Sequence, residues 1–223
     1  MGDRMRAIVI GASGGIGGAL AELLEARGAE VAALSRSRDG FDLTDEARII
    51  AGLAPLQGPF DLILVATGGL GVAGAPEKSL RALDPAAMAA EFALNATGPA
   101  LVLKHALRLM PRGGRAVFAA LSARVGSIGD NRLGGWYSYR ASKAALNQLI
   151  RTASVEVARS HPQAILAALH PGTVATGLSA RHLGTHPAVA PAEAAANLLR
   201  VIEGLSPADT GGFFDWAGQP VPW

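Results

Sequence analysis

The sequence predicts an α/β fold built on one Rossmann-type, doubly wound parallel sheet. Short, continuous apolar runs alternate along the chain with segments of helical periodicity, as expected for strands buried on both faces of a parallel sheet. A glycine-rich segment at 11–17 joins the first apolar run directly to the first helical segment. The 223 residues are 50% hydrophobic, enough for one well-buried core and too few for two, so we expect a single domain over residues 1–223.

The first strand, helix and strand are complete by residue 35. Residues 6–10 (RAIVI) are apolar and rich in β-branched side chains, which favours a strand, and residues 18–27 carry apolar side chains at helical spacing. Arg27 and Gly28 give this helix a basic last turn and a glycine stop. The apolar run at 29–35 follows at once and predicts the second strand.

The later segments continue the alternation. Apolar runs predict strands at 61–67, 115–122, 164–170 and 212–215, and helical spacing predicts helices at 44–53, 84–109, 138–160 and 192–203. The helix at 84–109 is alanine-rich, and we expect an interruption near Thr97 to Pro99 because proline lacks a backbone donor.

Composition excludes several classes of function. With no cysteine, the chain has no disulfide framework, thiolate metal site or cysteine nucleophile, and its 5 histidines form no metal-ligand spacing, so we expect no metal. A net charge of +2 gives little reason to expect nucleic-acid binding. No apolar stretch approaches the roughly 20 residues of a membrane helix, and the N-terminal apolar run is a strand and not a signal peptide. We therefore expect a cytoplasmic protein without a membrane anchor.

The segment GASGGIG suits a dinucleotide. Between a strand and a helix, bare backbone and the helix N-terminus can approach a pyrophosphate without a side chain in the way. A glycine-rich loop alone indicates only a tight turn, but this strand–turn–helix setting favours cofactor binding. The residues expected to contribute are Gly11, Ser13, Gly14, Gly15, Ile16 and Gly17.

The end of the second predicted strand indicates which cofactor. An acidic side chain here would accept hydrogen bonds from the ribose hydroxyls of NAD, but the chain has Ser35 and Arg36. Arg36 can pair with the 2′-phosphate of NADP, and Arg38 is close enough to assist. The alternative is that both arginines are solvated loop residues. We expect NADP(H) to be preferred over NAD(H).

Tyr139 and Lys143 stand four residues apart in the predicted helix at 138–160, so both side chains can reach one site. Carbonyl reduction needs a proton donor beside the developing alkoxide, and a nearby ammonium favours ionisation of a phenol. The alternative is a packed tyrosine beside a solvated lysine. Tyr137 has no lysine four residues on and is not the candidate.

Together, the glycine spacing of Gly11, Gly15 and Gly17 and the YRASK segment resemble the short-chain dehydrogenase/reductase family, in particular its small C-factor/sniffer-like carbonyl reductases. The resemblance extends from residue 6 to about residue 215. It implies that Lys143 also binds the nicotinamide ribose and that Asn95 holds a water in a proton relay, although an amide in a helix can be an ordinary buried hydrogen-bonding group. It also implies a homodimer or homotetramer.

The resemblance assigns further cofactor contacts. Asp42 and Leu43 match the pair that lines the adenine pocket, and the segment HPGTVAT matches the nicotinamide end through Pro171, Gly172, Val174 and Thr176. Where relatives carry NNAG, this chain has ATGG, so Ala66, Thr67 and Gly68 replace the asparagine contacts while Gly68 and Gly69 still permit close approach. Because only about six residues separate Arg36 from Asp42, we expect the helix usual there to be absent and the adenine side to be open.

The family's serine fits imperfectly. Relatives place it three residues before a glycine, which here is Ala123 before Gly126, and Ser122 stands one residue early. In a regular strand that shift reverses the side-chain direction. Ser122 can orient a substrate carbonyl only if the strand end is kinked or bulged. Otherwise its hydroxyl satisfies local backbone, and Ser127 is the reserve candidate.

The expected function is therefore NADP(H)-dependent hydride transfer between the nicotinamide and a carbonyl or alcohol, with Tyr139 as proton donor or acceptor. The alternative is a non-catalytic dinucleotide-binding sensor or signalling protein on the same fold. A serine hydrolase is set aside because no GxSxG segment surrounds Ser122. The loop after Thr176 contains Arg181, His182 and His186; these side chains would form a polar lid over the substrate or would simply be solvated.

Overall fold

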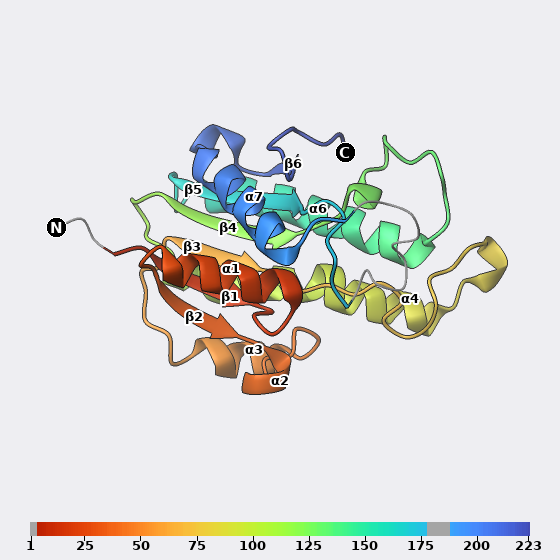
Figure 1. The fold of residues 1–223 in the computed structure, drawn as a ribbon, viewed down its shortest axis with the longest axis horizontal. Coiled ribbons are helices and arrows are strands. Elements are labelled where there is room, and N and C mark those ends of the chain that lie inside the picture. The colour runs from red at the N-terminus through yellow and green to blue at the C-terminus, as the bar shows by residue number, and fades with distance from the viewer. Residues whose placement is uncertain (1–3, 178–187) are drawn as a thin grey trace.

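The computed structural model describes residues 4–177 and 188–223 and contains one six-stranded parallel sheet (Figure 1). The strand order is β2-β1-β3-β4-β5-β6. Their bounds are β1 Arg6–Ile10, β2 Glu30–Leu34, β3 Leu62–Val65, β4 Ala116–Leu121, β5 Ala164–His170 and β6 Gly212–Asp215. This confirms the predicted fold class. Because all the strands are parallel, their carboxyl ends lie along one edge of the sheet.

Helices cover both faces of the sheet. Helices α1 (Gly15–Ala26) and α7 (Pro191–Gly204) pack together on one face, and α3 (Glu46–Leu53), α5 (Gly98–Ala106) and α6 (Tyr137–Val157) lie on the other (Figure 1). Strand β4 shows why its apolar run is continuous: Phe118 enters the core beneath α6, and Val117 enters the core beneath α1 and α7. Successive side chains of β4 are therefore buried alternately in the cores on the two faces of the sheet.

The link after β2 differs from the expectation. The sequence predicted no helix between Arg36 and Asp42, but the structure has one helical turn, α2 (Arg36–Asp39), which ends at the left-handed Gly40 (φ 65°). The Ser35 hydroxyl accepts a hydrogen bond from the Arg38 backbone N–H and caps this turn. A single capped turn fits a link too short for a packed helix, and the sheet ends at β2 on this side.

The alanine-rich helix runs from Pro85 to Leu109 without a break in direction. It comprises α4 (Pro85–Phe92), a π-helical segment Ala93–Thr97, α5 and a final 3₁₀ turn. The expected interruption is thus a change of hydrogen-bonding pattern just before Gly98. Pro99 lies inside this continuous helix, two residues after the π-helical segment, where the hydrogen-bonding pattern changes.

This composite helix also corrects the expectation that no apolar stretch approaches membrane-spanning length. At 25 residues it is long and apolar enough to pass that test by length and composition. However, α4 and α5 both pack against α6, and Val102 and Ala106 are completely buried in the core. This is the packing of a core helix.

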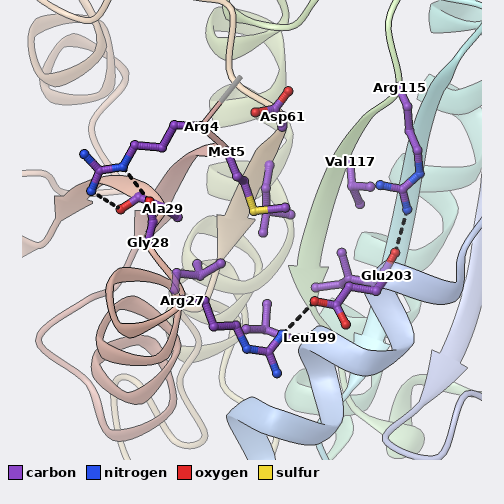
Figure 2. Close-up of a pocket in the computed structure, with 13 residues that line it drawn as sticks. Arg4, Met5, Arg27, Gly28, Ala29, Asp61, Arg115, Val117, Leu199 and Glu203 are labelled. Atoms are coloured by element: carbon purple, nitrogen blue, oxygen red, sulfur yellow. Dashed lines mark hydrogen bonds and ion pairs between the residues drawn. The ribbon is translucent and has the colours of Figure 1, made fainter. Parts of the chain in front are cut away.

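The edge opposite the carboxyl ends has its own crevice, shown in Figure 2. Its volume of about 900 Å³, mouth included, is close to the 860 Å³ of a second groove at the carboxyl edge, so size does not decide which is functional. Arg4 donates to the carbonyls of Gly28 and Ala29, Arg115 donates to two carbonyls at the end of α7, and Arg27 pairs with Glu203 at 2.6 Å (Figure 2). Arg4 and Arg115 thus satisfy carbonyls at or just after the C-terminal ends of α1 and α7, and Arg27 links the two helices, which gives the crevice a structural role.

Candidate active site

The glycine loop lies at the carboxyl end of β1 and leads into α1. Gly11 has a left-handed φ of 89°, which favours glycine. A Cβ at Gly17 would lie 2.3 Å from the Gly11 carbonyl oxygen, and a Cβ at Gly15 would lie 2.9 Å from the Thr176 methyl group. Gly14 stands at the N-cap of α1 with no side chain over the helix end. The loop therefore exposes bare backbone at a helix N-terminus, which fits a pyrophosphate.

A groove runs from this loop along the carboxyl edge. Its lining brings together residues that the sequence assigned to the pyrophosphate, the 2′-phosphate, the adenine pocket and the turn after β3, namely Gly11, Ser13, Gly14, Arg36, Asp42, Leu43, Ala66, Thr67 and Gly68. Ser37, Phe41 and Leu94 also line it and were not predicted. Ile16 faces the core beneath α1 instead and is only partly buried. Its assigned contact stays a prediction.

Several charged side chains lie near the end of the groove at β2. Arg36 is exposed and lines it, whereas Arg38 turns back, its Nε donating to the Ser35 hydroxyl at 3.3 Å. Asp39, which the sequence reasoning missed, accepts from the backbone N–H of Ser35 at 2.7 Å and from its hydroxyl at 3.1 Å. Asp42 accepts from Thr44, and these bonds, helped by the charge of Arg36, lower the pKa of its carboxyl group. Arg36 is thus the cation with its head group at the groove.

The turn after β3 brings the groove to the predicted catalytic helix. The hydroxyl oxygen of Thr67 is buried and has no hydrogen-bond partner among the described residues, so this groove wall has an unused polar atom. A Cβ at Gly68 would lie 3.2 Å from Lys143 Nζ and 3.3 Å from Asn95 Oδ1. The ATGG segment therefore keeps the close approach that its glycines suggested, and the groove's donors and bare backbone fit a dinucleotide.

Tyr139 and Lys143 lie on one face of α6, as their spacing predicted. Lys143 Nζ stands 6.0 Å from the centre of the Tyr139 ring and donates to the Leu121 carbonyl at the end of β4 at 2.8 Å. Burial lowers the pKa of Lys143 to about 8, although the Glu91 carboxylate acts in the opposite direction. Burial, reinforced by Glu91, raises the pKa of Tyr139 far above its ordinary value. The expected help from the ammonium is therefore outweighed by burial, and the phenol is held protonated.

Asn95 is completely buried in the π-helical segment. Its Oδ1 accepts from the Gly69 N–H at 2.9 Å, and its Nδ2 donates to the Gly69 carbonyl at 2.9 Å and to Glu91 at 2.5 Å. These bonds tie α4 to the turn after β3. Sequence reasoning missed Glu91, although its spacing of four residues before Asn95 on one helix was a usable signal. The relay role assigned to Asn95 stays a prediction.

The two serines have partners of their own. Ser122 donates its hydroxyl to Asn147 Oδ1 at 2.6 Å, and its backbone N–H continues the ladder to the Leu169 carbonyl. Ala123 is still extended, with φ −146° and ψ 145°. The kink or bulge that Ser122 needed is therefore not present, and its side chain points beneath α6. The Ser127 hydroxyl accepts from the Asp130 N–H at 3.1 Å.

The remaining family match surrounds the end of β5. Gly172 has φ 78° and packs so closely on Trp216 that a Cβ would lie 3.0 Å from the indole ring. Val174 is buried and pairs with Val189, and Thr176 lies against Gly15. These contacts bring the segment after Pro171 to the glycine loop. Arg181, His182 and His186, the proposed lid residues, lie outside the described residues.

The start of α6 is held in an unusual backbone conformation. Gly134 (φ 61°), Gly135 (φ 66°) and Trp136 (φ 51°) are all left-handed, and only glycine adopts that region without strain. The Trp136 N–H donates to the Glu77 carbonyl at 2.6 Å, and its ring meets the Tyr139 ring edge-on with centroids 6.3 Å apart. A non-glycine residue with such strain is typical of functional sites. The adjacent Gly-Gly pair was the one sequence signal for it.

Known proteins are similar to this chain in sequence. The sequence model of the family described as enoyl-(acyl carrier protein) reductase matches residues 11–212. The chain is 38% identical to the C-signal of Myxococcus xanthus over 74% of its own length and 94% of that protein. It is 30% identical to a 1-hydroxy-2-glutathionyl-2-methyl-3-butene dehydrogenase of Rhodococcus sp., covering 97% and 98% of the two chains.

Solved structures agree on the fold. The structure superposes on the NADPH-bound carbonyl reductase from chicken fatty liver with a TM-score of 0.83, 25% identity, and coverage of 99% of this chain and 100% of the other. The carbonyl reductase Sniffer of D. melanogaster gives the same TM-score at 22% identity, with the same coverage. These similarities extend over the whole sheet and both helical layers.

Proposed function

This chain belongs to the short-chain dehydrogenase/reductase family of oxidoreductases, which use a nicotinamide dinucleotide, and from that membership we propose NADP(H)-dependent reduction of a small carbonyl compound or oxidation of the corresponding alcohol. The bound cofactor would supply or accept the hydride. Tyr139 donates or accepts the proton at the substrate oxygen, and Lys143 stabilises the charge that develops there.

One observation carries this proposal: the buried Lys143 ammonium stands where the cofactor groove meets Tyr139. Its Nζ lies 3.2 Å from the Cβ position of Gly68, a groove residue, and 6.0 Å from the Tyr139 ring centre. Burying a charged lysine costs free energy, and such buried charges concentrate at functional sites. A lysine at this junction therefore supports a catalytic role. A phenol that stays protonated is a competent proton donor for a developing alkoxide.

The preference for NADP(H) rests on Arg36. It is the exposed cation at the β2 end of the groove, and the nearby Asp39 is occupied by two hydrogen bonds from Ser35. The Asp39 carboxylate is thereby bonded within its own turn, and the Arg36 guanidinium can pair with a 2′-phosphate. The chicken liver carbonyl reductase of similar fold was solved with NADPH, in line with this preference.

The first experiment is a fluorescence titration of the purified protein with NADPH and NADH, followed by a panel of ketones, aldehydes and quinones at the reduced-cofactor absorbance. We expect tighter binding of NADPH and turnover of at least one carbonyl. Tyr139→Phe should abolish turnover and retain NADPH binding. Tyr137→Phe, two residues earlier on α6, is the matched control and should keep both. Full turnover by Tyr139→Phe contradicts the proposal.

A second candidate function is a non-catalytic sensor or signalling protein that binds the same cofactor. The observation that favours it is the serine position: Ala123 stands where relatives carry the serine, and Ser122 is bonded to Asn147. The similarity to the protein named C-signal agrees with such a role. Tight NADPH binding without turnover on any carbonyl would support this candidate over the reductase.

We also propose that the protein is a single-domain, cytoplasmic homo-oligomer that acts on a small molecule. On α6, Leu149 and Val155 are 40% and 54% exposed, and apolar side chains on an outer helix face suit contact with a second copy. Sedimentation of the purified protein should give a dimer or tetramer, and Leu149→Glu with Val155→Glu should give a smaller species.

A further inference from the structure

Glu91 is a buried carboxylate for which the proposed reaction has given no role. It lies in the last turn of α4 with only 3% of its surface exposed. One carboxylate oxygen accepts from the Val72 N–H at 2.9 Å, and the other accepts from Asn95 Nδ2 at 2.5 Å. Both partners are donors, which is the pattern of an ionised acceptor. A buried charge is costly, and such residues concentrate at functional sites.

The charged and titratable groups around Glu91 come from two segments. From α6, Tyr139 and Lys143 face it; from the loop before α4, Glu77 faces it. Glu77, Glu91 and Tyr139 together line a small cavity. The pKa of Glu91 is raised above its ordinary value, mainly by burial and further by the charge of Glu77. The backbone N–H groups of the loop and the charge of Lys143 act in the opposite direction.

We propose that Glu91 is a positioning residue of the active site: its carboxylate holds the Asn95 amide in one orientation and places a negative charge beside Tyr139 and Lys143. The proposal deepens the oxidoreductase function proposed above and rests on it for its kinetic consequence. Glu91 is not among the residues that line the cofactor groove, and it acts through its neighbours.

The orientation follows from donor and acceptor chemistry. A carboxylate can only accept, so it must face the NH₂ group of Asn95 and not the amide oxygen. This directs Oδ1 toward the Gly69 N–H, on the side where Lys143 Nζ lies close to the Gly68 position. The Gly69 N–H and carbonyl favour the same orientation, so removing the carboxylate weakens the hold on the amide and does not by itself release it. The same removal takes away the negative charge that favours the protonated forms of Lys143 and Tyr139.

The test measures the charge state of Lys143 directly, without substrate or cofactor. The chain has three lysines, Lys78, Lys104 and Lys143, so side-chain carbon NMR of lysine-labelled protein resolves each titration, with Lys143→Arg for assignment. In the wild type we expect a titration near pH 8, because burial lowers the pKa of Lys143 to about 8. In Glu91→Gln we expect at least threefold weaker proton binding at Lys143. Glu91→Asp, which keeps the charge, should restore most of it.

Glu77→Gln is the matched control, because Glu77 is also buried and lines the same cavity but bonds to Ser138. Glu77→Gln should leave the pKa of Lys143 unchanged. Unfolding curves check that each variant is folded. An unchanged Lys143 titration in folded Glu91→Gln, or an equal shift in Glu77→Gln, overturns the proposal.

The kinetic arm separates the two proposals. In Glu91→Gln the alkaline limb of kcat/KM should move to lower pH, because Lys143 loses its proton earlier, while the KM for NADPH changes little. If the wild type turns over no carbonyl, the oxidoreductase proposal fails on its own, and the NMR titration still decides whether Glu91 controls Lys143. If the wild type is active and the pH profile of Glu91→Gln is unmoved, the role given to Glu91 is wrong.

Discussion

Gly17→Ala is expected to weaken cofactor binding through one added methyl group. The new Cβ would lie 2.3 Å from the Gly11 carbonyl oxygen and 2.7 Å from its carbon, whereas real Cβ contacts essentially never fall below 3.0 Å. The obstacle is backbone, so the loop itself must move by several tenths of an ångström. The same carbonyl accepts from the Gly14 N–H at 2.9 Å, and the Gly11 N–H donates to Leu34 across the turn. Moving it disturbs both bonds.

The size of both effects of Gly17→Ala follows from the steric clash that the added methyl group creates. A forced shift of this kind costs about 1–3 kcal/mol of unfolding free energy. The loop that must shift is also the proposed pyrophosphate cradle, so we expect NADPH affinity to fall at least tenfold, or about 1.4 kcal/mol. Urea denaturation measures the first quantity, and fluorescence titration with NADPH measures the second.

Gly18→Ala is the matched control on the same helix. Its Cβ would lie 3.3 Å from the Ala12 carbonyl oxygen, a contact that a small adjustment relieves. Alanine favours a helix over glycine by up to about 1 kcal/mol, so this variant should be as stable as the wild type or more so, with NADPH affinity retained. If Gly17→Ala matched Gly18→Ala in both stability and affinity, the loop geometry would not be the pyrophosphate cradle we describe.

Three further predictions concern single side chains. Arg36→Asp should weaken NADPH binding at least tenfold and leave NADH binding nearly unchanged, whereas Arg38→Ala should have little effect on either, as two-cofactor titrations will show. Ser122→Ala should cost about 1–3 kcal/mol in urea denaturation, because it leaves Asn147 Oδ1 buried without its donor, and should keep kcat; a large loss of kcat would assign Ser122 to the substrate. Lys143→Met should abolish turnover and yet stabilise the fold at pH 7. Burial lowers the pKa of Lys143 from 10.5 in the unfolded chain to about 8 in the folded protein. Between these pH values the unfolded chain binds a proton that the folded protein does not, so below pH 8 the buried ammonium lowers the free energy of unfolding of the wild type by about 3 kcal/mol. The lost bond to Leu121 offsets about 1 kcal/mol of this gain. The stability difference should shrink as pH rises from about 8 to 10.5, and equal stabilities at pH 7 would argue against a buried ammonium.

The elements that local pattern determines were predictable. The strand RAIVI, the glycine turn after it and the helix stop at Gly28 depend on residue types within a few positions, and all three appear as expected. The spacing of Tyr139 and Lys143 on one helical face depends only on helical periodicity. The single turn α2 and the π-helical segment Ala93–Thr97 were missed, because each is selected by small differences in hydrogen bonding within segments of ordinary helical composition.

Contacts between distant segments were not predictable from pattern. Glu77 bonds to Ser138 across 61 residues of sequence, and Ser122 bonds to Asn147 across 25. Strand alternation did state the condition that Ser122 had to meet, namely a kinked strand end, and the extended backbone at Ala123 does not meet it. The sequence thus predicted the backbone geometry that Ser122 would need, and the structure was needed to show that its hydroxyl bonds to Asn147.

A group of buried polar residues, some predicted and some missed, lies together at one edge of the sheet. Glu77, Glu91, Asn95 and Lys143 are polar and almost fully buried, and Trp136 adopts a strained left-handed backbone beside them. Burying such groups costs free energy, and hydrogen bonds among them offset part of the cost: Glu91 accepts from Asn95, and the Glu77 carbonyl accepts from the Trp136 N–H. The sheet beneath is apolar and regular, so it can carry this local cost. Variants that relieve the burial, such as Lys143→Met, should therefore gain stability as they lose chemistry, whereas variants of the apolar sheet should lose stability first.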